Sequence, residues 1–235
     1  MATKRRQISY LRMGRRSIPL AVRRHPRAHS ITVRIDNHTR GVTLVLPRRT
    51  PLAEGLAFVE EKAEWILNRL DALPKRIAFE HGAVIPVLGQ DHAICHLPDA
   101  RSGVWRSDGV IYVSGFAEHL ARRVTDFLKA EARLEISERA REKAALIDQR
   151  VRRITLRDTS TRWGSCTSNG DLAFSWRLIL APEEVLDYVV AHEVAHLRYM
   201  NHGKRFWSLT RKLTDEMDGP RDWLRDYGDN LMFYG

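Results

Sequence analysis

The sequence predicts an α+β fold, in which a β-rich N-terminal portion precedes a domain that mixes helices and strands. Two observations support this prediction. Residues 18–47 are rich in β-branched side chains and alternate between apolar and polar residues, which is typical of strands. Later segments, above all 116–149 and the stretch from 183, repeat their apolar residues at helical spacing.

The N-terminal portion is expected to hold two groups of strands with one helix between them. The first strands are SIPLAVRR, SITVRID and GVTLVLP, with a turn over 37–41. A single helix is expected over 51–73, because its apolar residues recur at helical spacing and Pro74 lies just beyond its end. Three short strands then follow, AVIPVLG, HAICHL and GVIYVSG.

The second portion is expected to begin with a helical stretch over 116–149. RITLRD (153–158) and the alternating segment 171–178 are strand candidates. Ala181-Pro182 then opens a helix with acidic residues in its first turn, as the helix dipole favours. A further helix is expected around Phe206. Because the β-rich portion ends before the helical stretch over 116–149, we predict a division of the chain into residues 1–115 and 116–235.

Composition predicts a cytoplasmic globular protein. Hydrophobic residues make up 43% of the chain and charged residues 29%, which are ordinary values. No apolar run approaches the ~20 residues that a membrane span needs. The two cysteines, Cys95 and Cys166, fall in different segments and suggest no disulfide framework, which fits a reducing compartment.

The positive charge is concentrated at the start of the chain. Residues 1–49 contain 13 Lys and Arg but only Asp36 as an acid, a net charge of +12, whereas the whole chain carries +10. Such a segment attracts nucleic acid through counterion release. The alternative is a basic, solvated sheet face that aids solubility.

His192-Glu193-Val194-Ala195-His196 is an H-E-x-x-H motif. On a helix, residues four apart lie on one face, so His192 and His196 can bind one Zn²⁺ while Glu193 stands beside the activated water. Glu193 would take the proton of that water and pass it to the leaving amine. The alternative is a core helix whose histidines are satisfied by hydrogen bonds, but packing gives no reason for this register of two histidines and a glutamate.

His202 is the expected third ligand, which leaves a fourth position open for water. The spacing equals that of the metzincins, but Tyr199 stands where these enzymes place glycine, so a metzincin assignment is disfavoured. A gluzincin arrangement would instead take an acidic ligand from Asp215, Glu216 or Asp218. For the oxyanion of the reaction, Arg198 and Tyr199 are candidate donors.

The segments TRWGSC (161–166), LILAP (178–182) and DYVVAHEVAHLRYMNHGKRFW (187–207) resemble the YgjP-like metallopeptidases, zincins related to the SprT-like proteases. The resemblance is specific over about 155–210. It implies a zincin-like catalytic domain with one catalytic Zn²⁺, ligands His192, His196 and His202, and Glu193 as the catalytic acid and base. Val194 and Gly203 depart from the usual Leu and Ser, which leaves substrate preference open.

Zincins bind their substrate as an extended strand against a sheet edge. We expect Arg162, Trp163, Gly164, Ser165 and Cys166 to form or adjoin that edge, with Gly164 permitting a close backbone approach. Trp163 is better explained as a core anchor. Cys166 is either a small buried hydrophobe, the reading we favour, or a thiol near the zinc.

The sequence thus predicts a zinc metallopeptidase that hydrolyses protein or peptide substrates. SprT-like relatives act on proteins attached to DNA, and together with the basic segment 1–49 this extends the prediction to nucleic-acid-associated proteins. The alternative function is a zinc-stabilised nucleic-acid-binding module without significant peptidase activity, which would have no use for Glu193 beside an open metal position.

Overall fold

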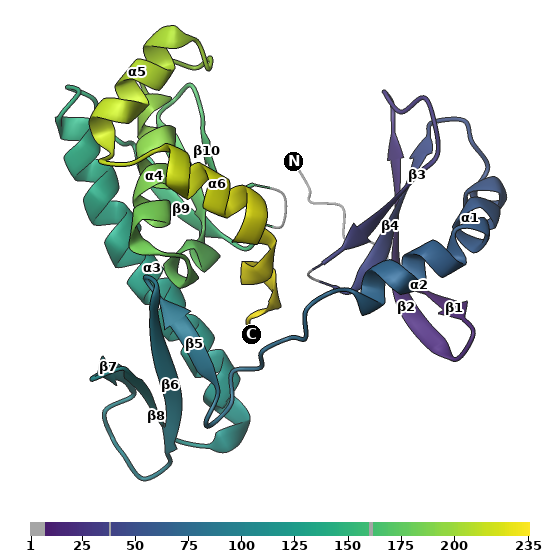
Figure 1. The fold of residues 1–235 in the computed structure, drawn as a ribbon, viewed down its shortest axis with the longest axis horizontal. Helices are drawn as coiled ribbons and strands as arrows, with labels where there is room; N and C mark the ends of the chain where they lie inside the picture. The colour runs from purple at the N-terminus through teal and green to yellow at the C-terminus, as the bar shows by residue number, and fades with distance from the viewer. Residues whose placement is uncertain (1–7, 38, 160–161) are drawn as a thin grey trace. The chain divides into compact units, whose positions relative to one another are not determined.

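The computed structural model describes residues 8–37, 39–159 and 162–235 (Figure 1). It divides into two compact units, an N-terminal unit of residues 1–75 and a C-terminal unit of residues 76–235. Residues 1–7 and His38, which belong to the basic segment 1–49, lie outside the described residues, as does Thr161. Both units combine sheets with helices, so the predicted α+β class is confirmed.

The N-terminal unit contains a four-stranded sheet in the order β1-β2-β4-β3. Its strands are β1 (Ile8–Met13), β2 (Arg16–His25), β3 (Thr32–Asp36) and β4 (Gly41–Pro47). The central pair β2 and β4 is parallel, and the two outer pairs are antiparallel. The sequence predicted β2, β3 and β4 but missed β1.

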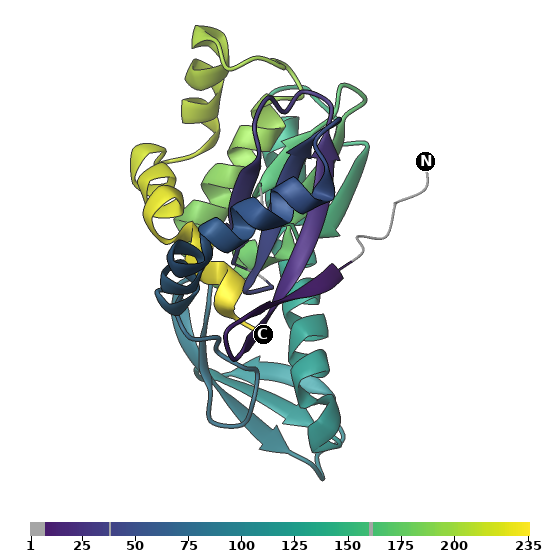
Figure 2. The ribbon, with the colours of Figure 1, turned by 90° about the vertical axis from the view of Figure 1, so that its right-hand side faces the viewer.

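Helices α1 (Leu52–Glu61) and α2 (Ala63–Asp71) replace the single helix predicted over 51–73. The backbone departs from helical geometry at Lys62, where φ is −92° and ψ is 11°. The helix α1 contacts β4 and α2 contacts β3, so the break lets the pair follow a twisted sheet. Both helices lie on the same face of this sheet (Figures 1 and 2).

The hydrophobic core of the N-terminal unit lies between this sheet and its two helices. Gly55 allows the closest approach, because a Cβ there would lie 2.5 Å from a methyl carbon of Leu46. The core consists of nine buried side chains from both layers: Met13, Ile18, Leu20, Val42, Leu44, Leu46, Val59, Ile66 and Leu70.

The C-terminal unit begins with a second four-stranded sheet of the same arrangement, in the order β5-β6-β8-β7 with β6 and β8 parallel. Its strands are β5 (Val84–Val87), β6 (Gln90–Leu97), β7 (Val104–Ser107) and β8 (Val110–Ser114), of which β7 was not predicted. The long helix α3 (Leu120–Ala145) contacts β7 and β8 and continues along α4 (Figure 1).

The boundary between the compact units differs from the predicted division after residue 115. Residues 76–115 pack with the second unit because their sheet shares its hydrophobic core. Two backbone contacts also join residues 76–115 to the rest of the C-terminal unit. The N–H of Leu88 donates to the carbonyl of Ile179 at 2.8 Å, and Ile77 forms a bridge with Tyr234.

A three-stranded sheet in the order β10-β11-β9 adjoins the helices of the C-terminal unit. It contains β9 (Arg153–Arg157), β10 (Gly164–Cys166) and β11 (Asp171–Ser175). The strand predicted over 171–178 ends at Ser175, and a 3₁₀ helix, η2 (Trp176–Leu180), follows. Within η2, Arg177 is buried, and its guanidinium group donates to Asp158 and to the carbonyls of Leu231 and Tyr234.

Three helices complete the C-terminal unit: α4 (Glu183–Ala195), α5 (Lys204–Leu213) and α6 (Asp218–Tyr227). A short 3₁₀ helix, η1 (Ala117–His119), precedes α3, and another, η3 (Gly228–Phe233), follows α6. Both α5 and α6 contact α4, which brings the segments after the H-E-x-x-H motif back to its helix. No helix within the described ranges has the length and apolar character to cross a membrane.

Candidate metal centre

Helix α4 positions the H-E-x-x-H motif at its C-terminal end. Pro182 precedes the helix, and Glu183 and Glu184 occupy its first turn, where the helix dipole favours acidic side chains. The helix is buried almost all round, with Val185, Leu186, Val189, Val190, Ala191, Val194 and Ala195 in the core. It ends at Ala195, so His196 lies at its C-cap.

The three predicted ligands come together. The ring nitrogens that His192, His196 and His202 can offer all lie within 4.8 Å of one another. The Nε2 atoms of His192 and His202 are 3.1 Å apart. His202 arrives from the loop between α4 and α5, so two turns of helix and one loop build the cluster.

This donor set fits a zinc ion. Nitrogens at 2.0–2.1 Å from a tetrahedral zinc lie roughly 3.4 Å apart, and the separation of His192 and His202 is of that size. Imidazole is a preferred zinc ligand, and three protein ligands leave one coordination position for water or substrate. Among the described residues, these histidines form the only cluster of His, Cys, Asp or Glu with metal-binding geometry.

The acids of the gluzincin alternative do not join this cluster. Asp215, Glu216 and Asp218 are exposed between the end of α5 and the start of α6. None of them belongs to the metal-binding group that the described residues form. The geometry therefore favours His202 over an acidic third ligand.

The backbone after α4 orients His196. Its Nδ1 lies 3.0 Å from the carbonyl oxygen of Tyr199, and a carbonyl can only accept, so Nδ1 carries the proton. The unprotonated Nε2 is then left as the metal ligand, as a hydrogen bond from the second ring nitrogen is expected to ensure. Tyr199 thus contributes its carbonyl oxygen, whereas the sequence suggested its hydroxyl as an oxyanion donor.

Two aromatic residues of α5 form a wall behind the histidines. The fully buried ring of Phe206 has its centroid 5.0 Å from that of His192, 4.5 Å from His196 and 4.7 Å from His202. The ring of Trp207 lies 5.8 Å from His192 and 5.5 Å from His202. Sequence reasoning assigned no site role to this pair; its position four and five residues after His202, one helical turn on, is the signal that could have found it.

Burial keeps His192 and His196 uncharged at neutral pH. It lowers the pKa of His192 to about 4, with further contributions from His196, His202 and Arg221. Burial also lowers the pKa of His196, to which His202 adds. Neutral imidazole is the form that binds a metal, so the site is preorganised for binding at neutral pH.

Glu193 follows His192 on the same helix turn and lies against β10. Its side chain is buried, with a relative exposure of 6%. A Cβ at Gly164 would lie 2.5 Å from both Cγ and Oε1 of Glu193, so only glycine leaves room for this carboxyl group. Burial raises the pKa of Glu193 to about 7, although Arg162 acts in the opposite direction. Such a group can both accept and donate a proton near neutral pH.

The other residues predicted near the sheet edge have different positions. Arg162 is exposed and precedes β10, close enough to Glu193 to affect its pKa. Trp163 packs on the core, where a Cβ at Gly228 would lie 3.2 Å from its ring, which agrees with the anchor interpretation. Ser165 pairs with Ala173 of β11 and is partly exposed.

Cys166 is a free, partly buried thiol. Burial raises its pKa to about 11, and the carboxylates of Glu193 and Asp171 add to this effect. Its Sγ lies 3.3 Å from the carbonyl oxygen of Thr167. A thiol in this state is protonated at neutral pH, so it behaves as a small side chain rather than as a thiolate.

Comparison with known proteins gives one match. The family model of the YgjP-like metallopeptidase domain matches residues 29–227, which includes the histidine cluster, Glu193 and β10. No curated protein and no solved structure matches the chain.

Proposed function

The chain belongs to the YgjP-like metallopeptidase family, and we propose that it hydrolyses peptide bonds with a zinc ion held by His192, His196 and His202. The observation that carries this proposal is the buried Glu193 beside a cluster of three imidazoles with metal-binding geometry. A cluster that only stabilised the fold would not need a carboxyl group whose pKa is raised towards neutrality.

The residues of this chain divide the work between them. A zinc ion at the imidazoles would supply a Lewis acid that activates water and polarises the scissile carbonyl. Glu193 takes a proton from the attacking water as the new C–O bond forms. It then returns this proton to the amine as the C–N bond breaks. Gly164 keeps the space in which that carboxyl group moves.

The edge strand β10 is proposed to align the substrate. It is paired with β11 on one side only, which leaves backbone groups on its other side for an extended peptide. Contacts between α4 and β10 bring this edge next to Glu193. A bound peptide would therefore present a backbone carbonyl to the metal centre.

Glu193→Gln tests the proposal. The variant keeps the volume of the side chain and removes its ability to take a proton, so we expect turnover of a peptide substrate to fall by about a thousandfold. Zinc content and the denaturation midpoint should be retained. Glu184→Gln is the matched control, since Glu184 is exposed in the first turn of the same helix. Unchanged turnover in Glu193→Gln would exclude the mechanism.

We also propose that the N-terminal unit binds nucleic acid, and one face of its sheet favours this. Strand register places Ile18, Leu20 and Leu44 on the helix-covered face. The opposite face, called here the open face, carries the exposed side chains of Tyr10, Arg12, Arg23 and Arg34, together with those of Ser17 and His25. Arginines around an exposed aromatic ring suit phosphates and stacked bases.

The salt dependence of binding tests this second proposal. Arg12→Gln, Arg23→Gln and Arg34→Gln together should weaken binding of a single-stranded oligonucleotide and reduce the slope of log K against log salt by up to about 0.7 per lost phosphate contact. The matched control is a triple substitution of Arg122, Arg152 and Arg225, which are exposed in the C-terminal unit and form ion pairs. Equal slopes for the two triple variants would contradict the proposal.

A further inference from the structure

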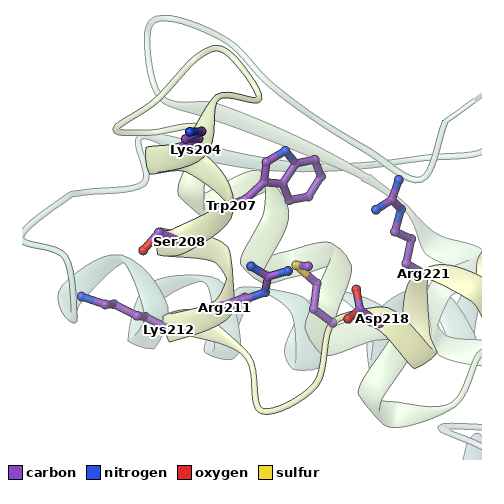
Figure 3. A pocket seen from close by; sticks show the side chains of 8 residues that line it. Lys204, Trp207, Ser208, Arg211, Lys212, Asp218 and Arg221 are labelled. Carbon is purple, nitrogen blue, oxygen red and sulfur yellow. The ribbon is translucent and has the colours of Figure 1, made fainter.

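A hollow of about 630 Å³ lies between α5 and α6 beside the histidine cluster. Figure 3 shows Trp207 and Arg211, from α5, and Arg221, from α6, around this hollow, with Asp218 near Arg211. The lining consists of Lys204, Trp207, Ser208, Arg211, Lys212, Met217, Asp218 and Arg221. Its volume is in the range of sites that hold a small ligand or one or two residues of a peptide.

The charge of this lining is strongly positive. Four cations, Lys204, Arg211, Lys212 and Arg221, stand against one acid, Asp218. All four cations are exposed, and in the part of the chain that the structure describes none of them forms a salt bridge. Cations that gather without acidic partners repel one another, so an anion in the hollow would be stabilised.

Several other cations of the C-terminal unit are paired with acids, unlike the four cations of the hollow. Arg139 contacts Glu135 and Glu183, and Lys143 contacts Asp187 at 2.8 Å. Arg225, one helical turn after Arg221 on α6, contacts two aspartates. The hollow thus gathers four cations around one acid within residues 50–235, which as a whole are slightly acidic.

Trp207 joins the hollow to the metal centre. Its ring lies 5.5 Å from the ring of His202 and also lines the hollow. The guanidinium carbon of Arg221 lies 5.6 Å from the same indole ring. An extended peptide advances roughly 3.3 Å per residue, so a chain with its scissile bond at the histidines reaches Arg221 within about three residues.

We propose that this hollow is a substrate subsite for a carboxylate carried by the peptide within about three residues of the scissile bond. This inference rests on the proposed peptidase function. A guanidinium binds a carboxylate through two parallel hydrogen bonds, and the indole ring offers an apolar surface to the methylene groups of the same residue. Asp218 within the lining favours one small anion over a run of phosphates, because its own charge would repel a longer polyanion.

The carboxylate has two sources, an acidic side chain or the free C-terminus of the substrate. Matched peptides separate them. One series carries a single Glu, or Gln in its place, moved along an alanine-based sequence with both ends blocked. A second series has no acidic side chain and ends in either a free carboxylate or a carboxamide. Binding is measured by fluorescence anisotropy on the zinc-loaded full chain carrying Glu193→Gln, so that no peptide is cleaved during the measurement.

In one of the two series, the peptide with the carboxylate should bind at least about tenfold more tightly than its uncharged counterpart. Arg211→Gln with Arg221→Gln should abolish this preference. The matched control is Arg205→Gln with Arg225→Gln, which removes one exposed arginine from each of the same two helices outside the hollow and should leave the preference intact.

Three outcomes would overturn the subsite: no preference in either series, a preference that survives Arg211→Gln with Arg221→Gln, or an oligonucleotide that binds the hollow while the peptides show no preference. Hydrolysis of the same peptides by the unsubstituted chain is scored separately. Cleavage without any carboxylate preference removes the subsite and keeps the proposed function. A preference in binding without cleavage keeps the subsite and removes the peptidase function.

Discussion

The two units of this chain differ in how their hydrophobic core is placed relative to their functional side chains. In the N-terminal unit, the nine core side chains lie between one face of the sheet and its two helices, and the exposed arginines of the open face lie on the other side of the sheet. In the C-terminal unit, the core reaches the site itself, because Phe206 is a core residue and also contacts all three histidines. Substitution of the exposed arginines should therefore leave the fold of the first unit intact. In the second unit, a residue such as Phe206 contributes both to the stability of the core and to the geometry of the metal site.

The two four-stranded sheets have the same strand arrangement but different packing partners. Both have a parallel central pair between two antiparallel hairpins. One sheet packs on α1 and α2 and forms a compact unit with them, while the other adds Ile85, Ile94 and Ile111 to the large core around α3 and α4. The same strand arrangement thus gives an independent unit or a part of a larger one, depending on which helices cover it.

The largest effect is expected from Phe206→Ala. Loss of a fully buried aromatic side chain should lower the free energy of unfolding by about 3–5 kcal/mol, and zinc affinity should fall with it because the wall behind the imidazoles is lost. Leu44→Ala is the matched change in the N-terminal unit and should cost about 2–5 kcal/mol without reducing zinc affinity. Denaturant titration and zinc competition measure both quantities; equal zinc affinities in the two variants would break the comparison.

A smaller, more local effect is expected from Gly164→Ala. The added Cβ would meet the side chain of Glu193 at 2.5 Å and displace its carboxyl group, so kcat should fall by about a hundredfold while zinc content is retained. Gly203→Ala serves as the control, since a Cβ there meets no atom closer than Asn201 Oδ1 at 3.7 Å. A Gly164→Ala protein with unchanged kcat would show that the close contact with Glu193 has no catalytic consequence.

The smallest effects on stability are expected when one charged side chain is neutralised in each unit. Asp187 holds Lys143 at 2.8 Å between α4 and α3, and both side chains are largely buried. Asp187→Asn should therefore lower the free energy of unfolding by about 1–3 kcal/mol. Arg34→Gln on the open face should change it by less than about 0.5 kcal/mol. Thermal or denaturant unfolding of both variants measures the two changes. A similar decrease in the free energy of unfolding for Asp187→Asn and Arg34→Gln would contradict the contrast between the two units.

The helical spacing of His192, Glu193 and His196 could be predicted from sequence, because it depends only on the geometry of one helix. For Gly164 the sequence predicted a close backbone approach at the sheet edge; the structure shows instead that its missing Cβ makes room for the Glu193 side chain. The strand prediction over 171–178 was too long because η2 is buried on all sides, so alternation of residue types no longer indicates which side is covered.

Features that depend on tertiary contacts could not be predicted in this way. No turn-forming residue marks the break at Lys62, which separates a helix that contacts β4 from one that contacts β3. The basic hollow requires α5 and α6 to be placed against α4, so that Trp207, Arg211 and Arg221 line the same hollow (Figure 3). In the sequence these two arginines are indistinguishable from the other exposed cations.

The central claim is that three histidines of the C-terminal unit hold one zinc ion, and metal analysis tests it most directly. The purified chain should contain one zinc per molecule, and His196→Ala and His202→Ala should each lose most of it. His119→Ala, which changes an exposed histidine at the end of η1, should keep one zinc per molecule. Markedly less than one zinc in the unsubstituted chain, or full retention in His202→Ala, would contradict this ligand assignment.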